Sequence, residues 1–480
     1  IGYQAGKAIT SGDGNIMIGA SAGSTTTDVD KAVIIGQNAG QANMTSAADG
    51  TIAIGYEAGK SITSGARQTF IGYQAGYSTT TGQENVFIGY QAGYSNLDNH
   101  ANIYIGKQVA YNVADGSYNV AIGEEAMKST GTAANNHPSY NVAIGNQAGY
   151  NLTTGDNNVF LGSRAGYAST TTQGNVAIGY EAGRYIVTSA GQTAVGYQAM
   201  KSMVDGHSNT AFGYQALTSE VASDESTAIG YQALTNQSGS TTTLGNTAVG
   251  HLAGRDTTTA YRNTYVGKSA ALTVTTGQQN TAIGWTALQS VRNGQGNTAV
   301  GAMAGNSVSG SSGNNVFVGD QAGYALTQTL GNVLVGYQAG TNGGTGERNT
   351  MLGHRVGMSL KGSNNVILGY DAAYVLSGSC SGNIILGSAT GHVAASVSYA
   401  VVIGNNAGYQ LTGTEATAPD NVILIGYRAG RLFTSGSGNV VVGDNAFYSS
   451  GARQYNTVMG SGAMYYATTA SSNVAIGYSS

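Results

Sequence analysis

The sequence predicts an all-β fold, a parallel β-solenoid of about 27 coils, because one short motif repeats along the chain. The motif is Asn, three apolar residues, Gly, two polar or aromatic residues and Ala, as at residues 141–148. The glycine after the apolar triplet (the marker glycine) occurs 28 times, and 20 of the 27 intervals between marker glycines are 17 residues long. In addition, 75 of the 480 residues are Gly and only two are Pro. A period this short indicates one small unit stacked on itself.

Each coil is expected to contain two short strands joined by turns. The apolar triplet, such as Val86-Phe87-Ile88, is strand-forming, whereas a helix needs about 10 to 12 residues with few glycines. We interpret residues 90–94 as a second short strand and Thr/Gly-rich segments such as 78–82 as turns. At the roughly 4.8 Å spacing of neighbouring strands, the coils would extend on the order of 130 Å.

Three recurring positions have physical interpretations. We expect the marker glycine either to adopt a φ that no Cβ would tolerate or to lie where coils approach closely. The Ala three residues later, as at Ala75 and Ala92, leaves room only for a methyl group and suits the coil interior. The Asn four residues before the marker is predicted to form a structural ladder of stacked amides. The ladder candidates are Asn85, Asn119, Asn141, Asn158, Asn280 and Asn332.

The repeat predicts one continuous region over residues 1–480, and since it begins and ends within a coil, we expect a fragment of a longer fibre protein. Insertions lengthen the repeat in four places, near residues 37–51, 124–141, 231–246 and 405–421. The only prolines, Pro138 and Pro419, lie in the second and fourth of these. Because proline cannot donate to a β-ladder, we expect the insertions to leave the coil as side loops.

Both faces of the triplet strand are apolar, which predicts an oligomer. Alternation sends the middle residue to the face opposite its two neighbours, yet all three positions are apolar, and a thin coil has only one interior. An apolar stripe along every coil would exceed what monomers expose, so identical chains around a shared axis would cover it. Which face meets the axis stays open. The middle residues proposed for this oligomer stripe are Phe70, Phe87, Phe160, Phe317 and Leu334.

Charge and motif content argue against several functions. The net charge is −4 and is not clustered, which gives no indication of nucleic-acid binding. The apolar runs are too short to insert into a membrane. The six His are scattered singly, and no metal-ligand spacing, recurring carboxylate pair, nucleophile elbow or phosphate loop occurs. We therefore expect no catalytic, cofactor or metal site.

Tyrosine is the informative side chain, with 31 in the sequence. Twelve follow a marker glycine directly and ten lie five residues after one, where Lys or Arg stands in other coils. Exchange between Tyr and Lys or Arg is typical of a position where the apolar part of the side chain is buried and its polar end is exposed to solvent. One interpretation is a ladder of stacked rings that stiffens the molecule, and the other is a lateral strip whose exposed rings stack on sugars. The candidates for glycan contact are Tyr73, Tyr77, Tyr90, Tyr94, Tyr150 and Tyr167.

The sequences Asn-Val-Ala-Ile-Gly at 119–123 and Asn-Thr-Ala-Ile-Gly at 280–284 resemble the head repeats of trimeric autotransporter adhesins. The fuller form at 280–288 more closely resembles phage tail-fibre repeats, which lie upstream of a self-cleaving chaperone domain. The resemblance spans essentially the whole chain. It implies a left-handed parallel β-roll, three chains around one axis, an extracellular or virion location and attachment to a host. Adhesin heads use a repeat shorter than 17 residues, so their coil shape does not transfer directly.

Together these observations predict the shaft of a homotrimeric fibre on a virion or cell surface. It would hold a receptor-binding tip and could contact host glycans or a receptor laterally. The alternative is a bacterial trimeric autotransporter-like adhesin or an extracellular filament.

Overall fold

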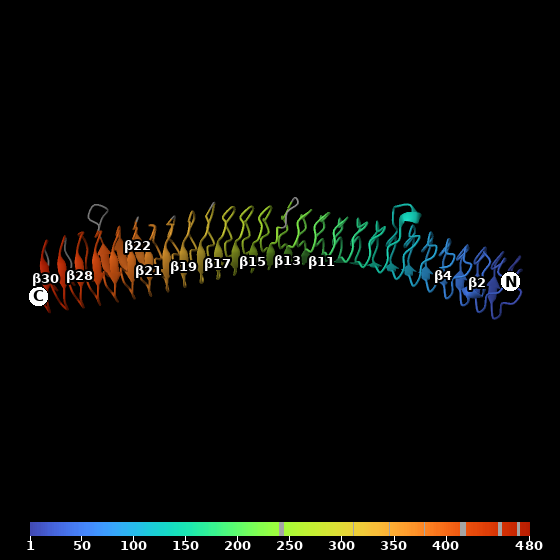
Figure 1. Ribbon diagram of the computed structural model, residues 1–480, viewed down its shortest axis with the longest axis horizontal. Coiled ribbons are helices and arrows are strands. Elements are labelled where there is room, and N and C mark those ends of the chain that lie inside the picture. Colours follow the sequence, from blue (N-terminus) through green and yellow to red (C-terminus); the bar gives the residue numbers. More distant parts are fainter. Residues whose placement is uncertain are drawn as a thin grey trace. The chain divides into compact units, whose positions relative to one another are not determined.

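The computed structural model is an all-β parallel solenoid of about 26 turns with a period of about 17 residues and almost no helix, which confirms the predicted fold class (Figure 1). It describes residues 1–239, 244–310, 312–344, 346–378, 380–412, 419–449, 454–467 and 471–480. The chain divides into two compact units, Ile1–Leu244 (unit one) and Gly245–Ser480 (unit two). Each unit is built from the same repeat.

Every strand of the main sheet is three residues long and coincides with one triplet that precedes a marker glycine. In unit one the strands are β1 (Ile16–Ile18), β2 (Val33–Ile35), β3 (Ile52–Ile54), β4 (Thr69–Ile71), β5 (Val86–Ile88), β6 (Ile103–Ile105), β7 (Val120–Ile122), β8 (Val142–Ile144), β9 (Val159–Leu161), β10 (Val176–Ile178), β11 (Thr193–Val195), β12 (Thr210–Phe212) and β13 (Thr227–Ile229).

Unit two continues the pattern with a main sheet and a small second sheet. The main-sheet strands are β14 (Thr247–Val249), β15 (Thr264–Val266), β16 (Thr281–Ile283), β17 (Thr298–Val300), β18 (Val316–Val318), β19 (Val333–Val335), β20 (Thr350–Leu352), β21 (Val366–Leu368), β23 (Ile384–Leu386), β25 (Val401–Ile403), β27 (Ile423–Ile425), β28 (Val440–Val442), β29 (Thr457–Met459) and β30 (Val474–Ile476). The second sheet contains β22 (Val375–Ser377), β24 (Val393–Ala395) and β26 (Gln410–Thr412).

Within each unit, a triplet strand pairs in parallel with the triplet of the next turn, without a shift in register. Phe87 of β5, for example, lies opposite Tyr104 of β6, and the residues on either side pair likewise. Equivalent repeat positions therefore stack above one another in columns. A residue's place in the 17-residue period decides both its column and its neighbours.

The prediction of a second strand at residues 90–94 is wrong. This segment is a turn, because Gln91 (φ 53°) and Gly93 (φ 59°) both adopt left-handed conformations that a strand cannot contain. In the described residues, a second strand occurs only at β22, β24 and β26, each beginning six residues after its marker glycine. The coil is thus one short strand followed by a long irregular turn.

The marker glycine meets both of its expected constraints. Gly89 has φ 137°, and a Cβ on it would lie 2.2 Å from the carbonyl oxygen of Gly106 in the next turn. Ala92, three residues later, is fully buried. The strand, the glycine and the alanine together enclose a narrow interior.

The middle residue of the triplet lies in this interior, and it is large in some turns and alanine in others. The five residues proposed for the oligomer stripe (Phe70, Phe87, Phe160, Phe317 and Leu334) all lie in this interior, with at most 1% of their surface exposed. They cannot form an outward stripe, because their rings and methyl groups fill space left by the glycine four residues after the marker. A Cβ on Gly93, for instance, would lie 2.7 Å from the Phe87 ring. The outward apolar face consists instead of the first and third triplet residues.

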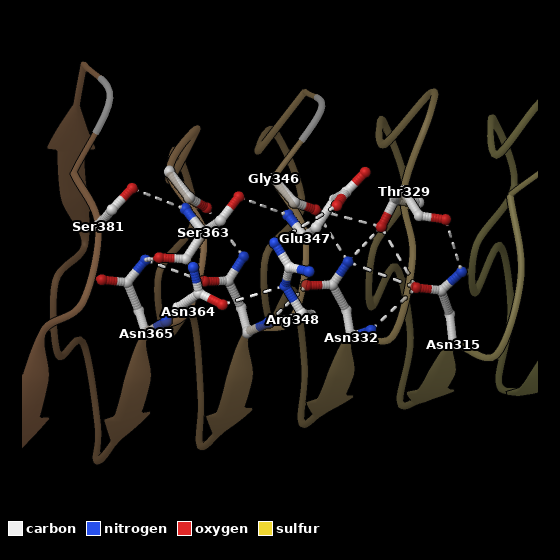
Figure 2. Close-up of polar contacts among 12 residues, drawn as sticks. Asn315, Thr329, Asn332, Gly346, Glu347, Arg348, Ser363, Asn364, Asn365 and Ser381 are labelled. Atoms are coloured by element: carbon white, nitrogen blue, oxygen red, sulfur yellow. Dashed lines mark hydrogen bonds and ion pairs between the residues drawn. The ribbon is translucent and has the colours of Figure 1, made fainter.

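The predicted asparagine ladder runs along the interior edge of the turns. The Oδ1 of Asn85 accepts hydrogen bonds from both N and Nδ2 of Asn102 (3.0 and 3.2 Å), and Asn102 Nδ2 also donates to the carbonyl of Gly116 (2.9 Å). Figure 2 shows the same arrangement in unit two around Asn332. All six candidates, Asn85, Asn119, Asn141, Asn158, Asn280 and Asn332, take part in it.

A second ladder, missed in the sequence, lies two residues before the asparagines. Its side chains accept a backbone N–H from the preceding turn: Ser363 Oγ accepts from Glu347 (3.0 Å), and Ser381 Oγ accepts from Ser363 (3.1 Å) (Figure 2). Two of the scattered histidines serve here, since Nδ1 of His100 accepts from Gln83 and that of His207 from Ala190. The signal was present but spread over Asp, Ser and His, which share only an acceptor atom.

Two of the predicted insertions contain the short 3-10 helices of the structure. The insertion near 37–51 holds η1 (Ser46–Ala48), and the one near 124–141 holds η2 (Ala133–Asn135), drawn as a small excursion in Figure 1. Of the other two insertions, residues 240–243 and 413–418 lie outside the described residues.

Candidate functional site

The exposed face of the triplet strands is apolar along both units. We define the outer stripe as the first and third residues of the triplet strands, which flank each buried middle residue. The first is Val, Ile or Thr, and the third is Ile, Val, Leu, Phe or Met, so no described triplet strand carries a charge there. Many of these side chains are well exposed, including Phe212 (55%) in unit one and Leu352 (49%) in unit two. Contacts within the described part of the chain leave this face uncovered.

Two aromatic columns border the turns. The corner column holds the residue directly after each marker glycine. In unit one its tyrosines form runs of stacked rings, with Tyr73 lying 5.1 Å from Tyr56 and 5.2 Å from Tyr90. These rings are 39 to 47% exposed, at Tyr56 and Tyr90 respectively. Spacings of this size are those of offset-stacked pairs.

The flank column holds the residue five positions after the marker. Tyr94 stacks on Tyr77 and on Tyr111, in both cases at 4.9 Å, and Tyr150 stacks on Tyr167 at 5.0 Å. Cations cap these runs, since Lys60 lies 5.2 Å from the centre of the Tyr77 ring. These tyrosines are half-buried. The exchange of Tyr with Lys and Arg in this column thus reflects cation–π stacking along the solenoid.

This stacking limits the glycan strip predicted from the sequence. Among the six candidates, five have both ring faces covered by a neighbouring ring or cation: Tyr73, Tyr77, Tyr94, Tyr150 and Tyr167. The sixth, Tyr90, has one face on Tyr73. Sugars stack on ring faces, whereas this arrangement offers ring edges and hydroxyl groups. The structure therefore places these residues together in two ladders without giving them the geometry that sugar stacking needs.

A glutamine ladder, also missed in the sequence, lies two residues after the marker. Nε2 of Gln91 donates to Oε1 of Gln74 (3.0 Å), and Gln108 donates to Gln91 in the same way. In three turns whose flank column carries a cation, glutamate replaces glutamine; Glu125, for example, pairs with Lys128 at 2.6 Å. The hydrogen bond from Lys128 lowers the pKa of Glu125 below its usual range. Positions two and five after a marker glycine therefore bring their side chains into contact.

In the flank column of unit two, His392 occupies a position that is Tyr in the neighbouring turns. Its imidazole ring stacks between the rings of Tyr374 and Tyr409, at centroid distances of 5.1 and 4.9 Å. Burial lowers the pKa of its imidazole, and its Nδ1 has no hydrogen-bond partner among the described residues. The unfolded chain therefore holds this proton more tightly than the folded chain, and stability falls as the pH drops below about 6.5 toward the lower folded value.

The variant His392→Tyr, which restores the ring ladder, should remove this contribution. We expect the thermal midpoint of the wild type to fall more between about pH 7.5 and pH 5 than that of His392→Tyr. Thermal unfolding followed by circular dichroism across this pH range measures the difference. His137→Tyr, at an exposed position outside the ring columns, serves as the control. Equal pH dependence of all three proteins would contradict the assignment.

The described residues contain no group of three or more His, Cys, Asp or Glu that could hold a metal ion. Nor does any helix within the described ranges have the length and apolarity needed to cross a membrane. What the geometry does define is a set of ladders and an uncovered apolar face. The chain is thus a repeat protein of the parallel β-solenoid class. It matches no protein-family model, and no curated protein is detectably similar to it.

Proposed function

We propose that the chain is the shaft of a fibre on a virion or cell surface, a left-handed β-roll wound as a homotrimer that holds a receptor-binding tip. The outer stripe is the observation that carries this proposal. It presents two apolar or threonine side chains per turn without a charge at any described triplet strand, from β1 to β13 in unit one and again in unit two. Monomeric proteins rarely expose apolar patches above a few hundred Å².

A second and third copy of the same chain are the occupants that fit this stripe. A partner must be apolar at every turn, and the same stripe on another copy has that character at the same spacing. Sheet faces pack about 10 Å apart with interdigitated side chains, so three copies can bury their stripes around one axis. The number three comes from the resemblance of the repeat to tail-fibre and adhesin repeats.

The ladders support a mechanical role. Neighbouring turns are bonded through their strands, and in many turns also through the asparagines, the glutamines or the stacked rings. Stability in such repeat structures is a sum over neighbouring turns, so the structure can be long without a central core. Because most ring faces in the two aromatic columns are covered, any lateral contact of this shaft with host glycans would use ring edges and hydroxyl groups.

Charges placed in the outer stripe should dissociate the assembly. We expect the double variant Leu161→Lys and Phe212→Lys, at positions 41% and 55% exposed, to shift the protein from trimer to monomer, because each trimer would bury six added ammonium groups. Sedimentation equilibrium and native mass spectrometry give the oligomeric state. Tyr90→Lys is the control, since the next turn already carries Lys107 in that column. A monomeric wild type, or dissociation of Tyr90→Lys as well, would refute the proposed interface.

Mass spectrometry of terminal peptides from the native particle distinguishes the biological settings. A self-cleaved chaperone-type end supports the virion fibre. A coiled-coil stalk that leads into a membrane anchor would make the chain a bacterial trimeric autotransporter-like adhesin instead. More of the same repeat at both ends would indicate an extracellular filament.

A further inference from the structure

One turn of unit two departs from the charge pairing of the others. After the marker glycine Gly426, the second and fifth residues are Arg428 and Arg431, and no other turn in the sequence has cations at both positions. In three other turns these two positions hold an acid and a base in contact. The pairs are Glu57 with Lys60 (2.8 Å), Glu125 with Lys128 (2.6 Å) and Glu181 with Arg184 (2.5 Å). Here the acid is replaced by a second guanidinium.

Neither guanidinium has a carboxylate within 4.0 Å among the described residues. The Nε atoms of both arginines are buried and have no hydrogen-bond partner in the described part of the chain. The carboxylate of Asp444 in the next turn instead accepts a hydrogen bond from Asn445 (3.1 Å). A buried N–H of a charged group without a partner is costly, so two in one turn call for an acceptor.

Aromatic rings hold both guanidinium groups in place. Arg431 lies between Tyr409 (5.5 Å) and Tyr448 (5.6 Å) in the flank column and donates from Nη1 to the Tyr448 hydroxyl. Arg428 lies 4.7 Å from the centre of the Tyr427 ring. Stacking fixes the planes of the guanidinium groups without using their in-plane N–H donors. The donors are therefore oriented before any ligand arrives.

We propose that Arg428 and Arg431 form a lateral site for an oxyanion, the carboxylate or sulfate of an acidic polysaccharide. Guanidinium groups recognise such planar or tetrahedral oxyanions through paired N–H donors, and two adjacent cations favour an anion between them. The chain as a whole carries a net charge of −4, so the attraction is local to this turn. The site does not depend on the fibre role, because it lies within one turn and its two neighbours in one chain.

The repeat itself supplies variants that should fold. Arg428→Gln introduces the residue of the glutamine ladder, and Arg431→Tyr continues the ring ladder between Tyr409 and Tyr448. Both replace an exceptional residue by the one most common in its column. Arg164→Gln is the matched control, since Arg164 occupies the same position as Arg428 but lies 3.9 Å from Glu181.

Isothermal titration calorimetry of the full chain at low ionic strength tests the site with four probes. These are inorganic sulfate, a sulfated oligosaccharide, a uronic-acid oligosaccharide and a neutral oligosaccharide of equal length. We expect the acidic probes to bind and the neutral one not to bind. Each single variant should weaken binding about tenfold and the double variant about a hundredfold, whereas Arg164→Gln should bind as the wild type does.

Comparison of the probes identifies the source of the oxyanion. Tighter binding of an acidic oligosaccharide than of sulfate supports an acidic polysaccharide as the ligand. Equal binding shows that the site recognises only small free anions, which overturns the assignment to a polysaccharide. Absence of binding, or equal loss in Arg164→Gln, overturns the site itself. Glu415 lies outside the described residues. The variant Glu415→Gln therefore tests whether this carboxylate pairs with the two arginines. If only that variant binds the acidic probes, the arginines are paired within the chain, and the proposal is wrong.

Discussion

Replacement of Gly89 by Ala is expected to destabilise the turns around it by on the order of 4 kcal/mol. Two effects add. At φ 137° an L-residue is strained, which costs about 1–3 kcal/mol. The new Cβ would also lie 2.2 Å from the carbonyl oxygen of Gly106, and relief of that overlap must separate two hydrogen-bonded turns, at about 1–3 kcal/mol. The obstacle is backbone, so no side chain can move aside.

Hydrogen exchange measured by mass spectrometry is suited to this prediction, because a solenoid can open locally while distant turns stay folded. Protection should fall in β4, β5 and β6 and remain unchanged several turns away. Gly174→Ala is the matched control. Gly174 has φ 65° and open space where a Cβ would lie, and Glu84 and Asn157 occupy the same place in other turns at φ 60° and 59°. Equal loss of protection in the two variants would contradict the argument from overlap.

The period in the sequence was enough to predict the solenoid, its parallel register and the asparagine ladder. All three follow from one requirement, that equivalent residues stack. The fold of residues 90–94 did not follow, because Gln91 adopts a left-handed conformation that glutamine rarely shows. Its cost is offset by bonds to Gln74 and Gln108 in the neighbouring turns. Local propensity cannot reveal a conformation that only the stacked state stabilises.

The inward face of the triplet was undetermined for a different reason. Val86, Phe87 and Ile88 are all apolar, so burial energy alone does not choose between the two orientations. The choice rests on Ala92 and Gly93, whose small size leaves room for the Phe87 ring across the coil. Likewise, Arg428 and Arg431 stand out only once the structure shows that their two positions touch in other turns. In both cases the decisive fact was which repeat positions lie next to each other in the structure, and residue type alone does not give it.

Asn141→Ala is the second substitution for which we expect a large effect, also on the order of 4 kcal/mol. The Asn141 side chain accepts from N and Nδ2 of Asn158 (2.9 and 3.0 Å) and donates to the carbonyls of Ser139 and Gly155 (2.9 and 2.8 Å). Truncation leaves the N–H of Asn158 and the carbonyl of Gly155 buried without these partners. Each such orphaned group costs about 1–3 kcal/mol.

Asn96 provides the comparison that isolates this effect. It is also a fully buried asparagine of unit one, but its Oδ1 and Nδ2 have no partner among the described residues. Its column holds Ile62 and Val113 in nearby turns. Asn96→Val should therefore leave stability unchanged or raise it by about 1 kcal/mol, because an unpaired buried amide is replaced by an apolar group.

Exchange rates of the amides near each site distinguish the two asparagines. We expect faster exchange from β7 to β10 in Asn141→Ala, with the largest change at the Asn158 amide, and no acceleration around β5 and β6 in Asn96→Val. If both variants lost protection equally, burial of the side chain rather than its hydrogen bonds would hold the turns together. The ladder would then be a consequence of stacking. If only Asn141→Ala opened its turns, the amide column would itself hold successive turns together, which would explain why an asparagine recurs at the same point of most coils.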